Sequence, residues 1–467
     1  MPLIKSVSGV RGIVDPRCGQ RVTLDAEVAC DLGRAFATYL RRRRRSGTES
    51  DPALLGSRDG RPGGGPFLEA FARGAWECGT RVIPLGIVTT PGTGLAVAEN
   101  RETLGVCGGV VITASHNPQQ WNGLKLLLDA GRAPTADQAR VIFDLFDRHD
   151  FDRINQGGPP PPPPVPDVHE LHVSRALEQV QPDAIEARRF RVALDSIHGA
   201  GARSGRMLLE RLGCSVAAIN PEPDMPFGRN AEPTAENLRD FCTIVADGEF
   251  DAAFAQDPDA DRLAIVDETG RYIGEEYTLA LAAKHVFATR PGPAVANLST
   301  SRMIDDLAAA GGGACVVHRS AVGEANVVET MDRVEAHLGG EGNGGVIDPR
   351  VVLIRDSLVA MAMVLQLMAD EARPLSQIVD DIPRYTIIKE KFEADRGRIE
   401  RILSAVGERF ADQRINDLDG LRIDWDTGWV HIRGSNTEPI MRIIAESQDE
   451  PSARELVARV RSVADTA

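Results

Sequence analysis

Six consecutive prolines, Pro159 to Pro164, interrupt the chain after its first third. Proline lacks a backbone N–H and holds φ at about −65°, so such a run cannot continue a helix or enter the interior of a sheet. The run therefore predicts an extended spacer, with a linker over residues 155–168 and a domain ending before it. A ligand for SH3- or WW-type domains is an alternative, but a linker accounts for the run fully.

Elsewhere the sequence alternates between two patterns. Short β-branched and apolar runs predict buried strands, and segments with apolar residues at helical spacing that end in glycine predict helices. The strands are expected at 80–88, 109–113, 190–196, 214–220, 262–268 and 293–299, and helices at 204–213 and 301–311. This alternation is typical of α/β domains, with βαβ units over 190–220 and 293–317. Beyond 372–385 charged, alternating strands and a closing helix indicate a small α+β unit instead.

Charge and composition exclude several classes of function. The net charge of −15 and the pI of about 5.2 disfavour binding to nucleic acid or anionic membranes, although a local basic pocket could still hold a small anion. The basic run Arg41–Arg45 closes an apolar-periodic segment, so we interpret it as a solvated helix C-terminus rather than a partner-binding patch. The longest apolar run, 358–369, is too short to span a bilayer and predicts a buried helix.

Cysteine usage and the N-terminal sequence point to a cytoplasmic protein. No CxxC pair occurs, and the dispersed, odd-numbered set argues for reduced thiols and against a disulfide framework or a zinc site. The first residues, MPLIKSVSGVRG, contain no apolar signal core. The seven cysteines are Cys18, Cys30, Cys78, Cys107, Cys214, Cys242 and Cys315.

Three aspartates at alternate positions, Asp257, Asp259 and Asp261, form the strongest local signal. Three carboxylates this close repel one another unless cations neutralise them, and they suit a hard divalent cation such as Mg²⁺. A calcium EF-hand is the rival interpretation, but that template requires glycine where this chain has Arg262, and the flanks predict strands rather than paired helices. Arg262 also adds a fixed cation beside the metal, which suits a phosphoryl group.

A second candidate site surrounds Ser115, which follows the predicted strand at 109–113. The sequence does not match the G-x-S-x-G elbow of α/β-hydrolases, and the adjacent His116 cannot adopt triad geometry because triad partners come from distant positions. A plain polar turn is the simplest alternative. Lys125, ten residues on, could act as a general acid/base or as a phosphate partner.

Two glycine-rich stretches complete the set of candidates. Residues 337–349 carry Glu341 and Asn343 among five glycines, which suits a bidentate grasp of adjacent sugar hydroxyls; a flexible turn is the alternative. Residues 432–443 gather hydroxyl, amide and guanidinium groups of the kind that bind a dianionic phosphate. These groups belong to Arg433, Ser435, Asn436, Thr437 and Arg442.

Taken in order, these motifs resemble the α-D-phosphohexomutase superfamily, which includes phosphoglucomutases, phosphomannomutases and phosphoglucosamine mutases. TASHNP is similar to that family's phosphoserine loop, DPDADR to its metal loop, GEGNGG to its sugar-recognition loop and RGSNTEP to its phosphate-binding loop. Weaker matches, such as SGVRG near the start and GSRDGRPGG, extend the resemblance over essentially the whole chain.

The resemblance implies a fold of three related α/β mixed-sheet domains and a C-terminal α+β domain around a central cleft. The domains would span 1–154, 169–272, 273–375 and 376–467. It also implies an isomerase, acting as a monomer or homodimer, that moves a phosphoryl group between the 1- and 6-positions of a hexose phosphate. The group would pass through phosphoserine at Ser115 and a hexose 1,6-bisphosphate.

By the same resemblance, Mg²⁺ would bind Asp257, Asp259, Asp261 and the phosphate on Ser115. The transfer centre would be lined by Arg11, His116, Lys125 and Arg262, with His116 a charge neighbour of the phosphoserine. Glu341 and Asn343 would hold sugar hydroxyls, and Arg433, Ser435, Asn436, Thr437 and Arg442 would hold the non-reacting phosphate.

The sequence leaves alternatives for the general acid/base and for the substrate. Many family members have a histidine where this chain has Gly345, so the general acid/base must be Lys125, His116 or another residue. Glucosamine phosphate is the favoured substrate, with glucose and mannose phosphates as alternatives. A Mg²⁺-dependent sugar phosphatase and a non-catalytic sugar-phosphate-binding protein are the rival functions.

Overall fold

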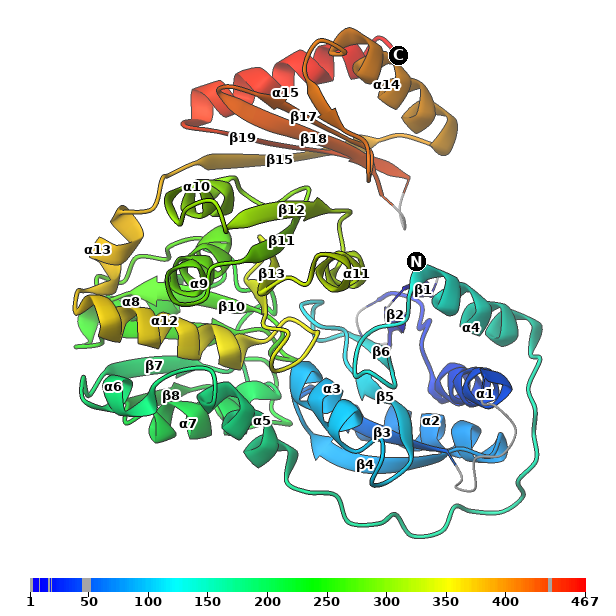
Figure 1. Cartoon of the computed structure of the whole chain (residues 1–467). Coiled ribbons are helices and arrows are strands. Elements are labelled where there is room, and N and C mark those ends of the chain that lie inside the picture. The colour runs from blue at the N-terminus through cyan, green and yellow to red at the C-terminus, as the bar shows by residue number, and fades with distance from the viewer. Residues whose placement is uncertain (1–2, 8, 16, 18, 44–51, 436–438) are drawn as a thin grey trace. The chain divides into compact units, whose positions relative to one another are not determined.

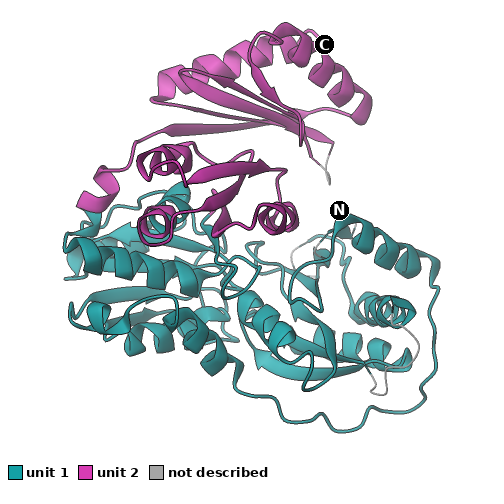
Figure 2. Cartoon of the chain, viewed as in Figure 1, with its two compact units in different colours: residues 1–282, 344–376 teal, residues 283–343, 377–467 magenta. Residues whose placement is uncertain are grey.

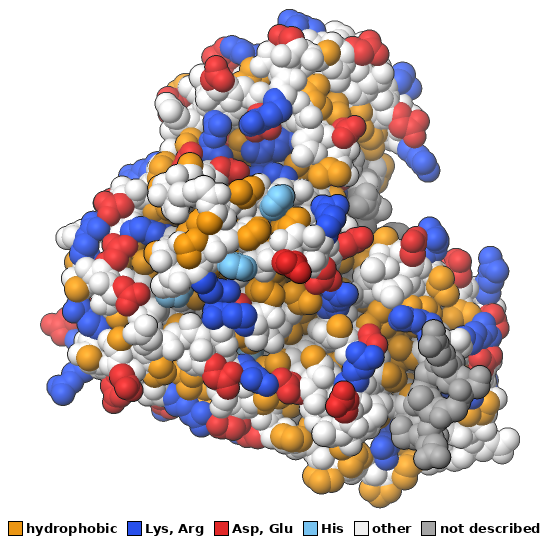
Figure 3. All heavy atoms as spheres, viewed as in Figure 1, with side chains coloured by type: hydrophobic (Ala, Val, Ile, Leu, Met, Phe, Trp, Pro, Cys, Tyr) orange, Lys and Arg blue, Asp and Glu red, His pale blue; other side chains and the backbone are white. Residues whose placement is uncertain are grey.

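The computed structural model describes most of the chain (Figure 1), namely residues 3–7, 9–15, 17, 19–43, 52–435 and 439–467. The chain divides into two compact units (Figure 2): unit 1 is Met1–Ala282 with Gly344–Ser376, and unit 2 is Ala283–Asn343 with Gln377–Ala467. Acidic and basic side chains are interspersed on the face seen in Figure 3. In the described part of the chain, no helix has the length and apolar character needed to cross a membrane.

The N-terminal part of unit 1 is a six-stranded mixed sheet in the order β1-β2-β6-β5-β3-β4. Its strands are β1 (Ile4–Ser6), β2 (Gly9–Ile13), β3 (Ala53–Arg58), β4 (Arg81–Ile87), β5 (Val106–Ile112) and β6 (Trp121–Leu128). Strand β3 is parallel to β4 and β5, whereas β6 is antiparallel to β5 and β2. The helices are α1 (Ala26–Arg43), α2 (Gly65–Glu77), α3 (Thr90–Glu99) and α4 (Ala136–Arg148).

Burial of apolar side chains holds helices α1 and α2 against this six-stranded sheet. Phe36 of α1 and Phe71 of α2 pack with Val110 of β5 and Leu124 of β6 in one buried cluster. The last turn of α1 is basic, as predicted, with Arg41, Arg42 and Arg43 at its C-terminal end. Arg44 and Arg45 lie outside the described residues.

Residues 150–167, all within the described part of the chain, form neither helix nor strand. The proline run is exposed except for the half-buried Pro163, and Val165 packs against the apolar cluster that contains Leu55 and Ile83. Regular structure resumes at α5 (Val168–Leu177), where the Asp167 side chain accepts a hydrogen bond from the His169 amide.

The second part of unit 1 is a four-stranded sheet in the order β10-β9-β7-β8. Its strands are β7 (Arg191–Asp195), β8 (Ser215–Ile219), β9 (Ala252–Gln256) and β10 (Leu263–Asp267), with helices α6 (Pro182–Glu186), α7 (Gly201–Arg211) and α8 (Arg239–Asp247). The parallel pair β7 and β8 with α7 between them confirms the predicted βαβ unit. Unit 1 also contains β14 (Gly345–Ile347) and α12 (Ser357–Glu371), whose burial over Ser357–Met368 confirms the helix predicted from the longest apolar run.

Unit 2 contains strands of two sheets that differ in topology. The first contains β11 (Pro293–Asn297), β12 (Val316–Ser320) and β13 (Leu338–Glu341), which are parallel, with α10 (Met303–Ala310) and α11 (Glu324–Val334). The second is an antiparallel sheet in the order β15-β19-β18-β17-β16. Its strands are β15 (Thr386–Glu393), β16 (Arg414–Asn416), β17 (Leu421–Trp425), β18 (Gly428–Gly434) and β19 (Ile440–Ser447).

Helices α14 (Arg396–Arg409) and α15 (Glu450–Ala464) cover one face of this antiparallel sheet (Figure 1). Helix α9 (Glu275–Thr289) and helix α13 (Leu375–Asp380) each contain residues of both units. Three mixed or parallel sheets with flanking helices, followed by an antiparallel sheet with α14 and α15, confirm the predicted fold class. The described cysteines are free thiols, and Cys18 lies outside the described residues.

Candidate active site

Ser115 lies in the loop between β5 and β6 of unit 1, and its backbone is strained. It has a φ of +51°, in the left-handed region that residues other than glycine rarely adopt, and its relative exposure is 1%. Its amide donates to Thr113 Oγ1 at 2.8 Å, and its carbonyl accepts from Arg61 Nη2 at 2.8 Å. A buried, strained serine held at both ends is unlike a plain surface turn and is typical of a functional position.

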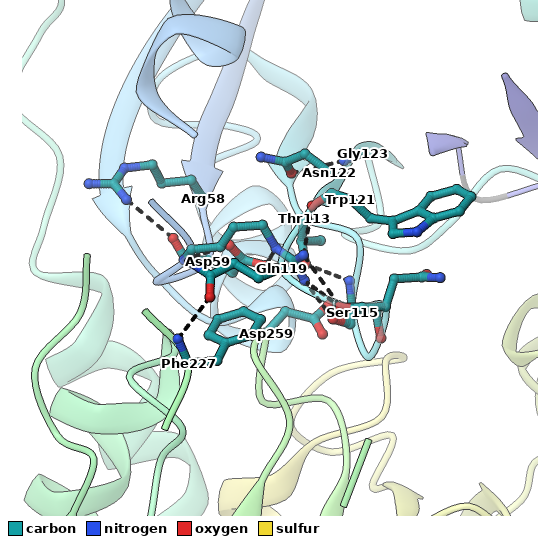
Figure 4. Close-up of polar contacts among 12 residues, drawn as sticks. Arg58, Asp59, Thr113, Ser115, Gln119, Trp121, Asn122, Gly123, Phe227 and Asp259 are labelled. Carbon is teal, nitrogen blue, oxygen red and sulfur yellow. Dashed lines mark hydrogen bonds and ion pairs between the residues drawn. The ribbon is translucent and has the colours of Figure 1, made fainter. Parts of the chain in front are cut away.

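A buried ion pair between Asp59 and Arg61 holds the loop that carries Ser115 in shape. The Arg61 guanidinium also donates to the carbonyls of Pro118 and Trp121 at 3.0 and 2.7 Å. Asp59 Oδ2 accepts from Arg61 Nε at 3.2 Å and from Thr113 Oγ1 at 2.6 Å; Figure 4 shows Asp59 and Thr113 beside the Ser115 loop. The five donors of an arginine suit a cluster of carbonyl oxygens, so this pair fixes the loop's shape.

The three aspartates of the metal-loop motif lie between the antiparallel strands β9 and β10 of unit 1. Asp257, Asp259 and Asp261 are fully buried, and one carboxylate oxygen of each lies within 4.8 Å of the others. Flanking strands instead of helices confirm that this is not an EF-hand. Ser115 Oγ donates to Asp257 Oδ2 at 3.2 Å, so the two motifs form one site.

Cations of the chain itself already contact these carboxylates. Lys125 Nζ donates to Asp259 Oδ2 at 2.6 Å and to Asp261 Oδ2 at 3.0 Å. Arg355 Nη2 donates to Asp261 Oδ2 at 2.8 Å, and Arg262 Nε lies 3.8 Å from Asp261 Oδ1. The mutual repulsion of the carboxylates is therefore compensated in part by the protein.

The donor set still fits a hard divalent cation. Asp259 Oδ1 and Asp261 Oδ1 are buried and have no hydrogen-bond partner among the residues that the structure describes. Leaving buried carboxylate oxygens without a partner is costly, and Mg²⁺ prefers such oxygens. The residues that would hold the ion are Asp257, Asp259 and Asp261.

The surroundings shift the pKa values of Asp257 and Asp261 in opposite directions. Burial and the neighbouring Asp261 and Asp259 raise the pKa of Asp257 well above its ordinary value. Burial also acts upward on Asp261, but Arg355, Lys125 and Arg262 outweigh it and hold its pKa well below the ordinary value.

His116 lies beside Ser115, with its Nδ1 3.4 Å from Ser115 Oγ. The Arg262 guanidinium, burial and Arg11 together lower the pKa of His116 to about 2. In the unphosphorylated chain this lowering of the pKa favours the neutral imidazole, and the role of His116 as a neighbour of the phosphoserine stays a prediction. Two of the arginines responsible, Arg262 and Arg11, were predicted to line the same centre as His116.

Arg11 reaches the same loop from β2, where it pairs with Gly123 of β6. Its Nη1 donates to Asn117 Oδ1 at 3.1 Å, and burial lowers the pKa of its guanidinium. The residues predicted around Ser115 therefore do lie together in unit 1.

Glu341 lies at the end of β13 in unit 2, and its carboxylate is tightly bound. Its Oε1 accepts from Asn297 Nδ2 at 2.8 Å and from the Gly323 amide at 3.1 Å. Asn343 Nδ2 lies 3.5 Å from Glu341 Oε2, and Asn343 Oδ1 is buried without a described hydrogen-bond partner. A strand end fixed in this way argues against a flexible turn.

The phosphate-loop residues flank the turn between β18 and β19. Arg433 and Arg442 are direct partners in the antiparallel register, so their side chains leave the same face of the sheet. The Ser435 amide donates to the Ile440 carbonyl at 2.9 Å. Asn436 and Thr437 lie outside the described residues.

Several residues of the unit 1 site were not predicted from the sequence. Arg355 is separated from Asp261 by more than ninety positions and has no motif around it. Thr90 donates from Oγ1 to Asp259 Oδ2 at 2.7 Å. Asp59 and Arg61 lie in GSRDGRPGG, a weaker sequence match that assigned them no role.

Four family models match the chain in order. They describe phosphoglucomutase/phosphomannomutase alpha/beta/alpha domain I (residues 3–153), domain II (170–270), domain III (275–385) and the C-terminal domain (389–463). A phosphoglucomutase/phosphomannomutase from Thermococcus kodakarensis is 36% identical, covering 96% of this chain and 95% of its own. A probable phosphoglucosamine mutase from Methanopyrus kandleri is 33% identical with the same coverage. The crystal structure of a phosphoglucomutase/phosphomannomutase family protein from Burkholderia thailandensis has the same fold, with a TM-score of 0.84 and 24% identity over 99% of this chain and 98% of that one.

Proposed function

The chain belongs to the phosphoglucomutase/phosphomannomutase family, and on that premise we propose that Ser115 carries the phosphoryl group exchanged between the 1- and 6-positions of a hexose. The coarser activity, that of a phosphohexomutase, follows from the family. The observation that carries the finer proposal is the 3.2 Å contact between Ser115 Oγ and Asp257 within a buried acidic triad.

In this proposal phospho-Ser115 gives its phosphoryl group to the free hydroxyl of a hexose monophosphate. The serine O–P bond breaks and a new O–P bond forms at the sugar oxygen. The proton of the sugar hydroxyl is taken up by a group of the chain and restored to Ser115 Oγ, the leaving oxygen. A hexose 1,6-bisphosphate results, and its other phosphoryl group returns to Ser115. The same bisphosphate would phosphorylate Ser115 initially. The strained backbone of Ser115 keeps Oγ aimed at the triad, which favours in-line transfer.

Two groups of the chain are candidates for holding the proton. The Nδ1 of His116 lies 3.4 Å from Ser115 Oγ, so the imidazole is placed to take up a proton there. Its pKa is lowered to about 2 by Arg262, burial and Arg11, and a dianionic phosphate on Ser115 would act in the opposite direction and make it a stronger base. Lys125 Nζ contacts Asp259 and Asp261, which would place its charge beside the transferred group. Gly345 leaves no side chain at the position where many family members have a histidine.

Charge balance supports a metal ion and a phosphoserine entering together. The three carboxylates of Asp257, Asp259 and Asp261 face four cationic side chains, those of Arg11, Lys125, Arg262 and Arg355. A divalent cation and a dianionic phosphate add no net charge to this set. Mg²⁺, when bound, would neutralise charge that develops on the transferred phosphoryl oxygens.

The groups of unit 2 would bind the rest of the substrate. Glu341 and Asn343 would hold two adjacent sugar hydroxyls, and Arg433, Ser435 and Arg442 would hold the non-reacting phosphate, with Asn436 and Thr437 between them in sequence. Local cations of this kind let an acidic protein bind an anionic sugar.

We propose glucosamine 6-phosphate, converted to glucosamine 1-phosphate, as the substrate. Relatives named as probable phosphoglucosamine mutases support this choice, whereas one relative is named for glucose and mannose phosphates. The pair Glu341 and Asn343 would not contact carbon 2, where these sugars differ, so the assay must decide.

The test offers glucosamine, glucose and mannose 6-phosphates separately with Mg²⁺ and catalytic hexose 1,6-bisphosphate, and follows the products by phosphorus NMR. We expect the 1-phosphate of each accepted sugar, with glucosamine giving the highest kcat/KM. Inorganic phosphate as the main product would favour a phosphatase and contradict the proposal. Binding without any product would indicate a non-catalytic sugar-phosphate-binding protein.

A further inference from the structure

Asp419, in the turn between β16 and β17, joins the two substrate-binding groups of unit 2. Its Oδ2 forms an ion pair with Arg433 Nε at 3.1 Å and accepts a hydrogen bond from the Val322 amide at 3.1 Å. The next amide, of Gly323, donates to Glu341 Oε1 at 3.1 Å. One carboxylate thus links the arginine of the phosphate strand to the backbone that holds Glu341.

A second route between the same two groups runs through His431, which is fully buried in β18. Its Nε2 lies 2.6 Å from the Asp419 carbonyl, and its Nδ1 lies 2.8 Å from Ser299 Oγ. Because a carbonyl only accepts, Nε2 carries the proton, and the neutral ring accepts the Ser299 hydroxyl at Nδ1. Burial lowers the pKa of His431 to about 4, which is consistent with a neutral ring.

Ser299 closes a circuit of hydrogen bonds. Its amide donates to Asn297 Oδ1 at 2.8 Å, and Asn297 Nδ2 donates to Glu341 Oε1 at 2.8 Å. The two routes from Glu341 therefore meet at Asp419. A closed circuit fixes its members more tightly than a single chain of bonds, because each bond restrains the partners of the others.

The turn that presents Asp419 is built for close approach. Gly420 has a φ of +72°, and a Cβ there would lie 2.3 Å from the Ile432 carbonyl oxygen and 2.8 Å from Arg433 Cβ. Only glycine satisfies both conditions without strain. The backbone of the turn is therefore pressed against β18 beside Arg433.

We propose that Asp419 is a positioning residue that fixes the Arg433 guanidinium at a set distance from Glu341. The inference rests on the proposed function, in which these two side chains bind the non-reacting phosphate and the sugar hydroxyls of one substrate. The two groups then act as a single pre-formed half-site, and the substrate does not have to order Arg433 when it binds.

Loss of the Asp419 contact is expected to change KM rather than kcat. The phosphate held by Arg433 does not react, so its contacts are equally strong in the ground state and the transition state. Losing such contacts raises KM and leaves kcat nearly unchanged. A variant that merely damaged the fold would instead lower the active fraction, and hence kcat, at an unchanged KM.

The test compares Asp419→Asn with wild type in the mutase assay. The Asn side chain keeps the shape but loses the charge opposite Arg433, so the ion pair that holds the guanidinium is lost. We expect KM for the hexose 6-phosphate to rise about tenfold, which corresponds to about 1.4 kcal/mol. We expect kcat within about twofold of wild type. Ser299→Ala interrupts only the second route and is expected to raise KM about threefold.

Asp417→Asn is the matched control, because Asp417 is an exposed carboxylate of the same turn and the change in net charge is identical. We expect its KM to be unchanged. Other contacts between the parallel-sheet and antiparallel-sheet parts of unit 2 remain in all three variants. Among them is the hydrogen bond that Arg422 Nη1 donates to the Leu298 carbonyl at 2.7 Å.

The outcomes separate the two proposals. An unchanged KM in Asp419→Asn, or a loss confined to kcat, overturns the positioning role while wild-type turnover upholds the mutase. A wild-type chain that gives no mutase turnover refutes the proposed function itself, and the inference that rests on it falls at the same step.

Discussion

Replacing Arg61 with leucine tests whether the buried ion pair builds the Ser115 loop. The substitution keeps an apolar stem of similar width but removes every donor of the guanidinium. Asp59 then stays buried without its charge partner, and the carbonyls of Ser115, Pro118 and Trp121 lose their donors at 2.8, 3.0 and 2.7 Å.

The expected loss of stability is large. Breaking a buried ion pair by removing one partner costs about 3–5 kcal/mol. We take about 4 kcal/mol for Arg61→Leu, which corresponds to a fall in Tm of about 10 °C for a domain of this size. The freed loop no longer holds Ser115 in its strained conformation, so phosphorylation of Ser115 by hexose 1,6-bisphosphate is expected to slow about a hundredfold.

The assay measures thermal unfolding and the rate of phosphate incorporation by intact mass. Arg58→Leu is the control, because Arg58 lies three residues away and forms a bidentate pair with Asp224 at 2.6 Å that is partly exposed. Exposed pairs contribute at most about 1 kcal/mol. Equal losses for Arg61→Leu and Arg58→Leu, or a wild-type phosphorylation rate in Arg61→Leu, would refute the reasoning.

Three further outcomes are expected. Chelation should abolish turnover and added Mg²⁺ restore it, and Asp257→Asn should weaken Mg²⁺ binding at least about tenfold in calorimetry; an unchanged affinity would contradict the triad assignment. Arg355→Met should lower kcat about tenfold, because it removes a cation from Asp261 beside the transfer centre; a normal kcat would make Arg355 only structural. Burial lowers the pKa of His431 from 6.5 to about 4, so the unfolded chain binds more protons between these pH values and the stability present above pH 6.5 is lost as pH falls toward 4. The loss is at most about 3 kcal/mol, and denaturant unfolding should depend less on pH in His431→Gln; identical pH dependence would contradict a buried neutral histidine.

Local sequence patterns predicted much of the fold. The strand at 190–196 and the helix at 204–213 appear as β7 and α7, because their apolar spacing matches a buried strand and one face of a helix. The change of pattern after residue 385 appears as an antiparallel sheet, since β17 and β18 are joined by a short turn. Boundaries differ by at most three residues, as at α7, which begins at Gly201.

The unit 1 site was predictable where function depends on residues close in sequence. Asp257, Asp259 and Asp261 share a loop, so their proximity follows from spacing alone. The contacts of Arg355 and Thr90 with the triad come from distant segments and follow only from the tertiary fold. The lowered pKa of His116 likewise depends on Arg262, in the loop between β9 and β10, and on Arg11 of β2, both distant from it in sequence.

The circuit around Asp419 shows the same limit in unit 2. Asp419 and Gly420 are typical turn residues, and His431 in the middle of a strand has no neighbouring motif. Their importance arises because β18 places His431 against Asp419 and Ser299, which no local pattern encodes.

The most direct test of the account follows the phosphate on Ser115 itself. The chain is phosphorylated by hexose 1,6-bisphosphate with radiolabelled phosphoryl groups, freed of excess bisphosphate and mixed with unlabelled glucosamine 6-phosphate in a single turnover. We predict that the label leaves Ser115, appears in the sugar, and is replaced on Ser115 by unlabelled phosphate; Ser115→Ala takes up no label. Label released as inorganic phosphate, or retained on Ser115 while product forms, would contradict phosphoryl transfer through Ser115.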